Sequence, residues 1–171
     1  MYDFYFTDKK NIKKDPEKFL IFVKRLLPRW ANGIPDTECI AIFKLLEKLK
    51  KKNKKKLVLL ETGCGASTIA MYLHCSINGG RMFSWDTNAS KGSFLKSVIT
   101  QSIDQVLGTR EFTFAIRSNA VSDPTFVSNS IANVNIYAKH PTLIFTRDHK
   151  NTNTFIVCVI NKVNSFSESS I

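Results

Sequence analysis

Near the middle of the sequence, an acid and two glycines directly follow an apolar run. Residues 57–60 are Leu-Val-Leu-Leu, and Glu61, Gly63 and Gly65 come next. Glycines at a strand-to-helix turn let the backbone approach a ligand closely, and the helix that follows presents free N–H groups. This stretch is therefore predicted to hold a ligand through its backbone.

A second acid, Asp86, ends the next predicted strand, 23 residues after Gly63. The carboxyl ends of neighbouring parallel strands meet at one edge of a sheet, and ligands bind in the crevice there. A carboxylate at this place can accept hydrogen bonds from ribose hydroxyls. The two strand ends together predict a site for a nucleoside-containing ligand.

The turn departs from a dinucleotide-binding turn in two ways. Thr68 stands where the third glycine of that fingerprint belongs, and Glu61 places a negative charge where a pyrophosphate would lie. The same charge suits a ligand that carries an ammonium or a sulfonium group. The residues therefore favour a cationic nucleoside derivative over a dinucleotide.

These features resemble the first two motifs of the class I S-adenosylmethionine-dependent methyltransferases. The first motif of that family is an apolar strand, an acid and G-x-G, and the second is an acid that closes the next strand. Residues 85–93, Trp-Asp-Thr-Asn-Ala-Ser-Lys-Gly-Ser, look like a small-molecule O-methyltransferase-like subgroup. The resemblance covers about residues 36–116.

The resemblance implies that several positions bind the cofactor, S-adenosyl-L-methionine. These positions are Glu61, Gly63, Gly65, Asp86, Thr87, Asn88 and Asp123. The first three would hold the methionine part, the next three would lie at the ribose, and the last would lie near the adenine. The alternative interpretation of the pattern is a glycine turn and a strand-end acid that bind no ligand.

The resemblance offers one candidate pair for catalysis, Asp148 and His149. Related O-methyltransferases have an acid at the end of the fourth strand, often followed by Asp-His, but Thr146 and Arg147 occupy the place of that first acid here. As a base, the pair would deprotonate a substrate hydroxyl. A polar loop between two strands explains the pair equally well, and no metal site is predicted.

Alternating strands and helices must position these residues. The predicted strands are 57–60, 82–85, 112–116, 142–146 and 155–160. The predicted helices are 15–28, 36–50, 66–79 and 90–107. This alternation predicts an α/β fold, a Rossmann-like three-layer α/β/α sandwich with a mostly parallel sheet. The family resemblance implies seven strands, so the last strands of that core would be missing.

Three regions follow from these elements. Residues 1–56 form a helical segment with a lysine-rich connection, 57–160 form the Rossmann-like core that binds S-adenosylmethionine, and 161–171 form a loose tail. Trp30, before the turn at 32–35, would either cover the cofactor or anchor the two N-terminal helices.

Net charge is unevenly distributed along the 171 residues. The chain carries +11, from 25 Lys and Arg against 14 Asp and Glu, of which residues 1–56 carry +9. The lysine run 50–56 is interpreted as a solvated connection. Contact with RNA is a less favoured interpretation, because no aromatic residues are interleaved with the lysines.

The sequence predicts a cytoplasmic protein that is not bound to membranes. No apolar run is long enough to span a bilayer, no secretory signal is recognised, and the four cysteines show no CxxC spacing. The expected partner is a small-molecule methyl acceptor, with a homo-oligomer formed through an exposed sheet edge. Two alternative functions are a catalytically degenerate cofactor-binding or assembly module, and an RNA methyltransferase.

Overall fold

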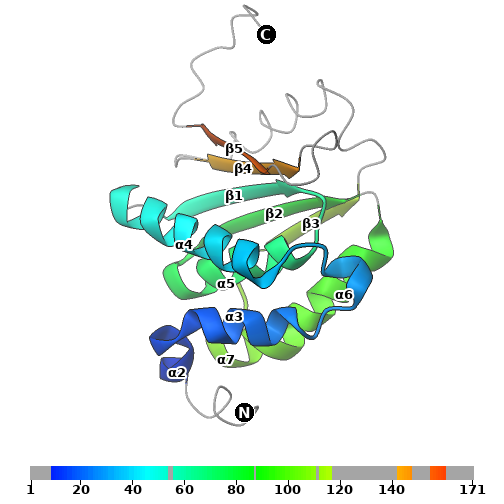
Figure 1. Ribbon diagram of the computed structural model, residues 1–171, viewed down its shortest axis with the longest axis horizontal. Coiled ribbons are helices and arrows are strands. Elements are labelled where there is room, and N and C mark those ends of the chain that lie inside the picture. The colour runs from blue at the N-terminus through cyan, green and yellow to red at the C-terminus, as the bar shows by residue number, and fades with distance from the viewer. Residues whose placement is uncertain are drawn as a thin grey trace, which may run out of the picture.

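A five-stranded sheet forms the centre of the computed structural model (Figure 1), which describes residues 9–53, 56–86, 88–110, 112–116, 142–147 and 155–160. The strands are β1 (Leu57–Thr62), β2 (Gly80–Asp86), β3 (Phe112–Ile116), β4 (Thr142–Arg147) and β5 (Phe155–Ile160). Their order across the sheet is β3-β2-β1-β4-β5. The first four run parallel, and β5 is antiparallel to β4. The predicted α/β fold with a mostly parallel sheet is thus confirmed.

The helices agree with the predicted ones except at three places, one of which is the predicted helix 15–28, whose α-helical part ends at Lys24. The helices are α2 (Lys9–Lys14), α3 (Pro16–Lys24), the 3₁₀ turn η1 (Arg29–Ala31), α4 (Asp36–Asn53), α5 (Ala66–Asn78), α6 (Ala89–Ile99), the π-helical turn η2 (Thr100–Asp104) and α7 (Gln105–Leu107). Helix α2 was not predicted. The predicted helix 90–107 consists of α6, η2 and α7 in succession. The spacing of its apolar residues does not indicate the π-helical turn η2.

The start of α3 follows the sequence pattern closely. The Asp15 carboxylate accepts a hydrogen bond from the Lys18 backbone N–H at 3.3 Å, and Pro16 occupies the first helical turn. An acid at this position satisfies an N–H that has no partner inside the helix, and proline there loses no hydrogen bond.

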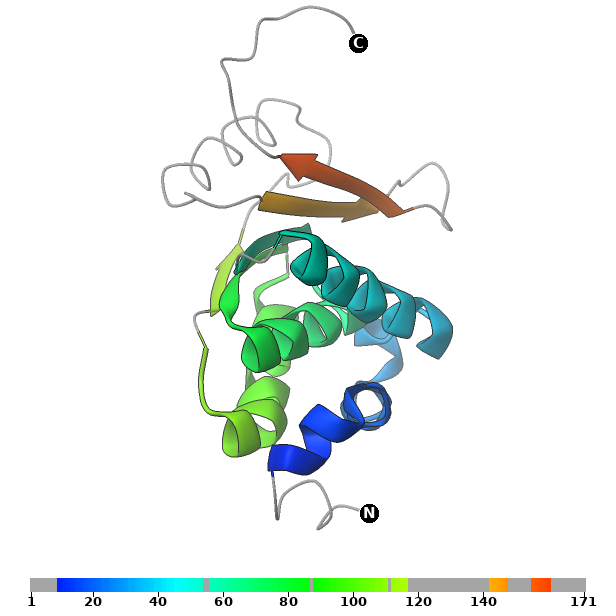
Figure 2. The ribbon, with the colours of Figure 1, turned by 90° about the vertical axis from the view of Figure 1, so that its left-hand side faces the viewer.

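The described helices lie on one side of the sheet (Figures 1 and 2), where α5 packs on β1 and β2 and α4 packs on α5. Leu57 and Leu59 of β1 belong to the core that these helices form with the strand. Val58 and Leu60, which point to the opposite face, are buried as well. A strand buried on both faces is typical of the centre of a parallel sheet. A helical layer on the second face would come from residues outside the described ranges, so the three-layer sandwich stays a prediction.

The N-terminal helices share one hydrophobic core with the sheet. Ile12 of α2 and Phe19 of α3 are completely buried in the same cluster as Leu57 and as Ile103 of η2. Within the described ranges, none of the helices combines the length and the apolar composition of a transmembrane segment.

The glycine at the start of β2 is required by a close backbone approach. Gly80 has φ +147°, and a Cβ there would lie 2.5 Å from the carbonyl oxygen of Leu57. Gly80→Ala is therefore expected to lower the free energy of unfolding by about 3 kcal/mol, because it adds both backbone strain and overlap. Urea unfolding measures the change.

The matched control is Gly108→Ala. Gly108 also has a positive φ, +77°, but a Cβ there would meet no atom within 4 Å. Gly108→Ala is therefore expected to lower the free energy of unfolding by only about 1 kcal/mol, the cost of a positive φ for alanine. Equal losses in the two variants would show that the contact with Leu57 is not what requires glycine at position 80.

Candidate functional site

The two predicted strand ends meet in the structure. The backbone N–H of Cys64 donates a hydrogen bond to Oδ2 of Asp86 at 2.9 Å, and the Cys64 thiol donates to the same oxygen at 3.1 Å. The N–H of Gly63 donates to the carbonyl of Trp85 at 2.7 Å. The glycine turn after β1 is therefore fastened to the end of β2. Figure 1 shows both ends at the same edge of the sheet.

Asp86 is held as a carboxylate by its neighbours. Its Oδ1 accepts a hydrogen bond from the backbone N–H of Asn88 at 2.8 Å, and the Lys91 amino group lies 3.5 Å from Oδ2. Burial raises the pKa of Asp86, but the hydrogen bonds from Asn88 and Cys64 and the charge of Lys91 together lower it below its ordinary value. A ligand at this edge would meet a charged acceptor at neutral pH.

The two glycines of the turn serve different purposes. Gly63 is exposed, with φ +84°, and a Cβ there would meet nothing within 4 Å, so its face is open to a ligand. A Cβ on Gly65 would instead lie 3.2 Å from the carbonyl oxygen of Ala31 in η1. Gly63 therefore gives the turn its left-handed conformation. Gly65 lets the N-terminal segment pack against the turn.

Glu61 lies beneath the turn and is only 2% exposed. Its Oε1 accepts hydrogen bonds from the hydroxyls of Thr68 and Ser84, the latter at 2.7 Å, and its Oε2 accepts one from Ser67 at 2.9 Å. Burial raises the pKa of Glu61 to about 7, although all three hydroxyls act to lower it. The carboxyl group thus ties β1, β2 and the start of α5 together. Its predicted contact with a cofactor stays a prediction.

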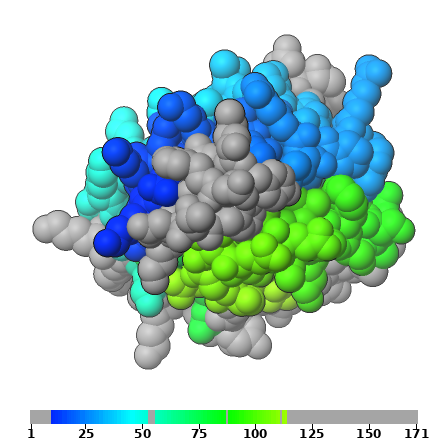
Figure 3. All heavy atoms as spheres, turned by 90° about the horizontal axis from the view of Figure 1, so that it is seen from below, coloured from blue at the N-terminus to red at the C-terminus, as the bar shows by residue number. Residues whose placement is uncertain are grey.

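The segment before α4 forms a wall beside the turn. Trp30 is 56% exposed, and its ring lies 5.1 Å from the ring of Phe94 in α6. It therefore links η1 to α6, and Figure 3 shows the blue N-terminal segments beside the green helices α6 and α7. The Oδ1 atom of Asn32, next in the chain after η1, is buried and has no hydrogen-bond partner among the described residues.

Sequence reasoning missed Ala31, whose carbonyl oxygen lies against Gly65, and Lys91 as residues beside this turn. Ala31 lies in a segment predicted only as a turn, and such a segment gives no sign of which distant loop it will contact. Lys91 follows Asp86 by five residues, and only the path of the chain into α6 brings its amino group to the carboxylate.

Four of the predicted site residues fall outside the described ranges. They are Thr87, Asp123, Asp148 and His149. The predicted tail 161–171 also falls outside them. Among the described residues, there is no group of three or more His, Cys, Asp or Glu side chains that could hold a metal ion.

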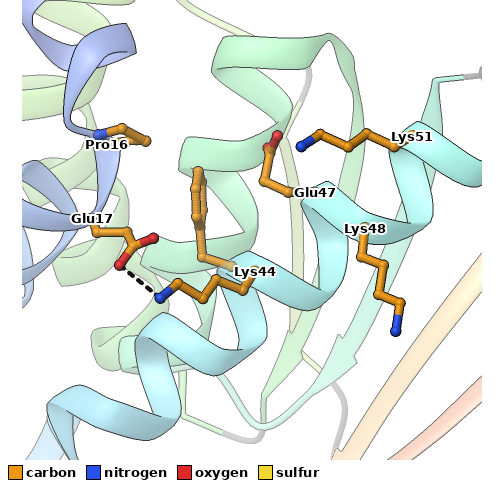
Figure 4. A pocket seen from close by; sticks show the side chains of 7 residues that line it. Pro16, Glu17, Lys44, Glu47, Lys48 and Lys51 are labelled. Carbon is orange, nitrogen blue, oxygen red and sulfur yellow. Dashed lines mark ion pairs between the residues drawn. The ribbon is translucent and has the colours of Figure 1, made fainter.

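A pocket of about 410 Å³ lies away from this edge, between α3 and α4 (Figure 4). Lys44 pairs with Glu17 at 3.1 Å, and Figure 4 shows the Lys51 amino group directed toward Glu47. Glu47 also accepts a hydrogen bond from the buried His74, with Nδ1 and Oε1 2.8 Å apart. This part of the lysine-rich segment therefore presents both signs of charge, and the pocket does not favour an anionic ligand.

Comparison of the chain with protein-family models and with curated proteins found no match.

Proposed function

We propose that this protein binds S-adenosyl-L-methionine and transfers its methyl group to an oxygen of a small molecule. One observation carries the proposal: the Asp86 carboxylate lies against the glycine turn, within 2.9 Å of the Cys64 backbone nitrogen. The family resemblance implies that Asp86 binds the ribose of the cofactor and that the glycine turn holds its methionine part. This hydrogen bond joins the two.

The order of the strands supports a ligand at the same edge. The chain passes from β1 to β2 and β3 on one side and then returns to β4 on the other side of β1. Ligands of open α/β sheets bind at the carboxyl ends of the strands where the order reverses in this way. Gly63, whose face is open, follows β1 at that point. We further propose that the whole fold is a Rossmann-like three-layer α/β/α sandwich.

The described residues fit the nucleoside part of the cofactor. Asp86 Oδ1 accepts one protein hydrogen bond, from Asn88, and a carboxylate oxygen can accept a second, such as one from a ribose hydroxyl. Thr68 in place of a third glycine agrees with a ligand that has no pyrophosphate.

When bound, S-adenosylmethionine would supply an electrophilic methyl group on a sulfonium. The protein would contribute chiefly by positioning, because in-line transfer needs the acceptor oxygen held against that methyl group. Asp86 would fix the ribose, and the turn at Gly63 would set the depth at which the ligand lies. Asp148 and His149 remain the proposed groups for removing a proton from the acceptor hydroxyl.

Calorimetric titration with S-adenosylhomocysteine tests the proposal. We expect one site with a dissociation constant in the micromolar range, and no binding of NAD, which requires a turn that accepts pyrophosphate. Absence of heat with S-adenosylhomocysteine, confirmed by an unchanged Tm at millimolar ligand, would overturn the proposal. Binding without methyl transfer to any compound in a panel of phenols, catechols and carboxylic acids would support the cofactor-binding module instead.

A further inference from the structure

His74 lies at the contact between α4 and α5 and is not among the residues of the proposed site. Its side chain is completely buried, and its Nδ1 atom lies 2.8 Å from Oε1 of Glu47 in α4. The Asn78 side-chain amide donates to the same oxygen at 2.5 Å. Because a carboxylate oxygen only accepts hydrogen bonds, the proton of a neutral ring at His74 lies on Nδ1.

The other ring nitrogen of His74 has surroundings that suit only the neutral ring. Its Nε2 atom is buried and has no hydrogen-bond partner among the described residues. The ring of Phe43 lies edge-on to the imidazole, with the ring centroids 6.2 Å apart. A protonated imidazole would place a charged N–H at Nε2 with no acceptor, and an unpaired buried donor is costly. This side of the ring therefore disfavours protonation.

The groups that act on the charge of His74 oppose one another. Burial disfavours the protonated ring most, Glu47 favours it, and the positive charge of Lys50 in α4 disfavours it. Together they lower the pKa of His74 below its ordinary value of 6.5. Elements α3, β1, β2, α6 and η2 also pack on α5, but within the described ranges none of them supplies a further charged group that acts on His74.

The C-terminal end of α4 depends on this contact more than the start of the helix does. Residues 47–53 include four lysines, and Lys48 and Lys52 lie four positions apart, where like charges repel each other. Leu49 at this end is only partly buried. Near the start of α4, by contrast, the completely buried Cys39 thiol donates to the first carbonyl of α5 at 3.6 Å. A positive charge on His74 would therefore weaken the C-terminal end of α4 first.

We propose that the His74–Glu47 contact is a pH-sensitive switch, which holds the C-terminal end of α4 on α5 at neutral pH and releases it in acid. Release exposes the His74 ring to water, where both of its nitrogens can be protonated and hydrogen-bonded. Because the released state binds a proton that the closed state excludes, release becomes more favourable as pH falls below 6.5. The inference does not depend on the proposed function.

Hydrogen exchange at the backbone amides tests the switch. Protection factors are measured at about pH 7 and about pH 5.5 and are corrected for the intrinsic effect of pH on exchange. Those of residues 46–53 are expected to fall by about 5- to 10-fold at the lower pH, and to be smaller than those of β1 at both pH values. Equal protection of α4 and β1 at both pH values would show that α4 opens only when the whole protein unfolds, and would overturn the proposal.

Three variants separate His74 from other titrating groups. His74→Asn keeps a donor for Glu47 but does not titrate, so the fall in protection is expected to disappear. Glu47→Gln keeps an acceptor and removes the charge that favours the protonated ring, so the fall should be at least as large as in the wild type. Ser76→Ala is the matched control, because it removes a buried hydroxyl from α5 and no titrating group.

The readout is the ratio of protection factors at the two pH values, so a general loss of stability in a variant does not affect it. Ser76→Ala should show the ratio of the wild type. A ratio in His74→Asn equal to that of the wild type would assign the pH dependence to another group and overturn the proposal.

Chemical shifts of the imidazole nitrogens, measured by NMR, give a second readout that needs no variant. At neutral pH they are expected to show a neutral ring at His74 with its proton on Nδ1, and a titration midpoint below 6.5. A ring that titrates at or above 6.5 would overturn the proposal, even if His74→Asn does not fold.

Discussion

Asp86→Ala is expected to weaken binding of S-adenosylhomocysteine by roughly 100-fold, the largest effect on ligand affinity of any single change proposed for this protein. The estimate follows from the loss of hydrogen bonds between a charged acceptor and ribose hydroxyls, at about 1.5–3 kcal/mol each. The neighbouring N–H groups of Cys64 and Asn88 remain in the variant but cannot replace an acceptor. Isothermal titration measures the change directly.

The same variant is expected to lose stability, which requires a control. The buried N–H of Cys64 would lose its acceptor, at a cost of about 1–3 kcal/mol. Asp104→Asn provides the comparison, because Asp104 is partly buried and its Oδ1 accepts a hydrogen bond from the Tyr72 hydroxyl at 2.5 Å, in a structural contact between η2 and α5. We expect Asp104→Asn to lower Tm without changing affinity.

Stoichiometry identifies the folded fraction in each titration. A fitted stoichiometry near one with a 100-fold weaker dissociation constant would assign the effect to the site. An affinity for Asp86→Ala within twofold of the wild type would remove the ribose contact from the proposed function.

Glu61→Gln is expected to produce the largest change in the pH dependence of stability. The folded-state pKa of Glu61 is raised to about 7 from an ordinary value of 4.5. Between these two values the folded protein binds a proton that the unfolded chain does not, so the free energy of unfolding falls as pH rises from about 4.5 to about 7. The full loss is about 3 kcal/mol, because one pKa unit corresponds to about 1.4 kcal/mol.

Glutamine removes this titration while preserving the shape of the side chain. Relative to the wild type, Glu61→Gln should therefore gain about 3 kcal/mol between pH 4.5 and pH 8. Denaturant unfolding at several pH values gives this difference. His74 has a pKa that is lowered by burial, so its titration raises the free energy of unfolding as pH rises. Because His74 is present in both proteins, its contribution cancels in the difference.

Glu38→Gln is the control for the removal of one negative charge. Glu38 lies in the first turn of α4 and is half-buried. If the difference in the free energy of unfolding between Glu61→Gln and the wild type does not change over this range, the burial of the Glu61 carboxyl group among Ser67, Thr68 and Ser84 does not hold a proton.

Glu61 and Asp86 look alike in the sequence. Each stands at the end of an apolar run, and the family resemblance implies that each binds the cofactor. Their surroundings separate them: Asp86 accepts hydrogen bonds from backbone N–H groups beside a lysine, which favours its ionised form. Glu61 is surrounded by hydroxyls and apolar side chains, which stabilise a charge less well.

The sequence by itself determined the strands, the main helices and the meeting of the two strand ends. These follow from local causes: a continuous apolar run is stable only inside a sheet, and the Asp15-Pro16 pair can begin a helix without losing a hydrogen bond. The adjacency of Gly63 and Asp86 followed because consecutive parallel strands with a helical crossover usually lie side by side.

Only the tertiary structure decided how the side chains of the site are used. The placement of Ala31 beside Gly65, and of Lys91 beside Asp86, depends on how η1 and α6 pack at the sheet edge, which no local pattern encodes. The burial of Glu61 likewise depends on Ser84, 23 residues away in the sequence. Helix and strand periodicities act over a few residues, whereas the acceptors and donors at this edge come from residues 61–68 and 84–91, which most of α5 separates in the chain.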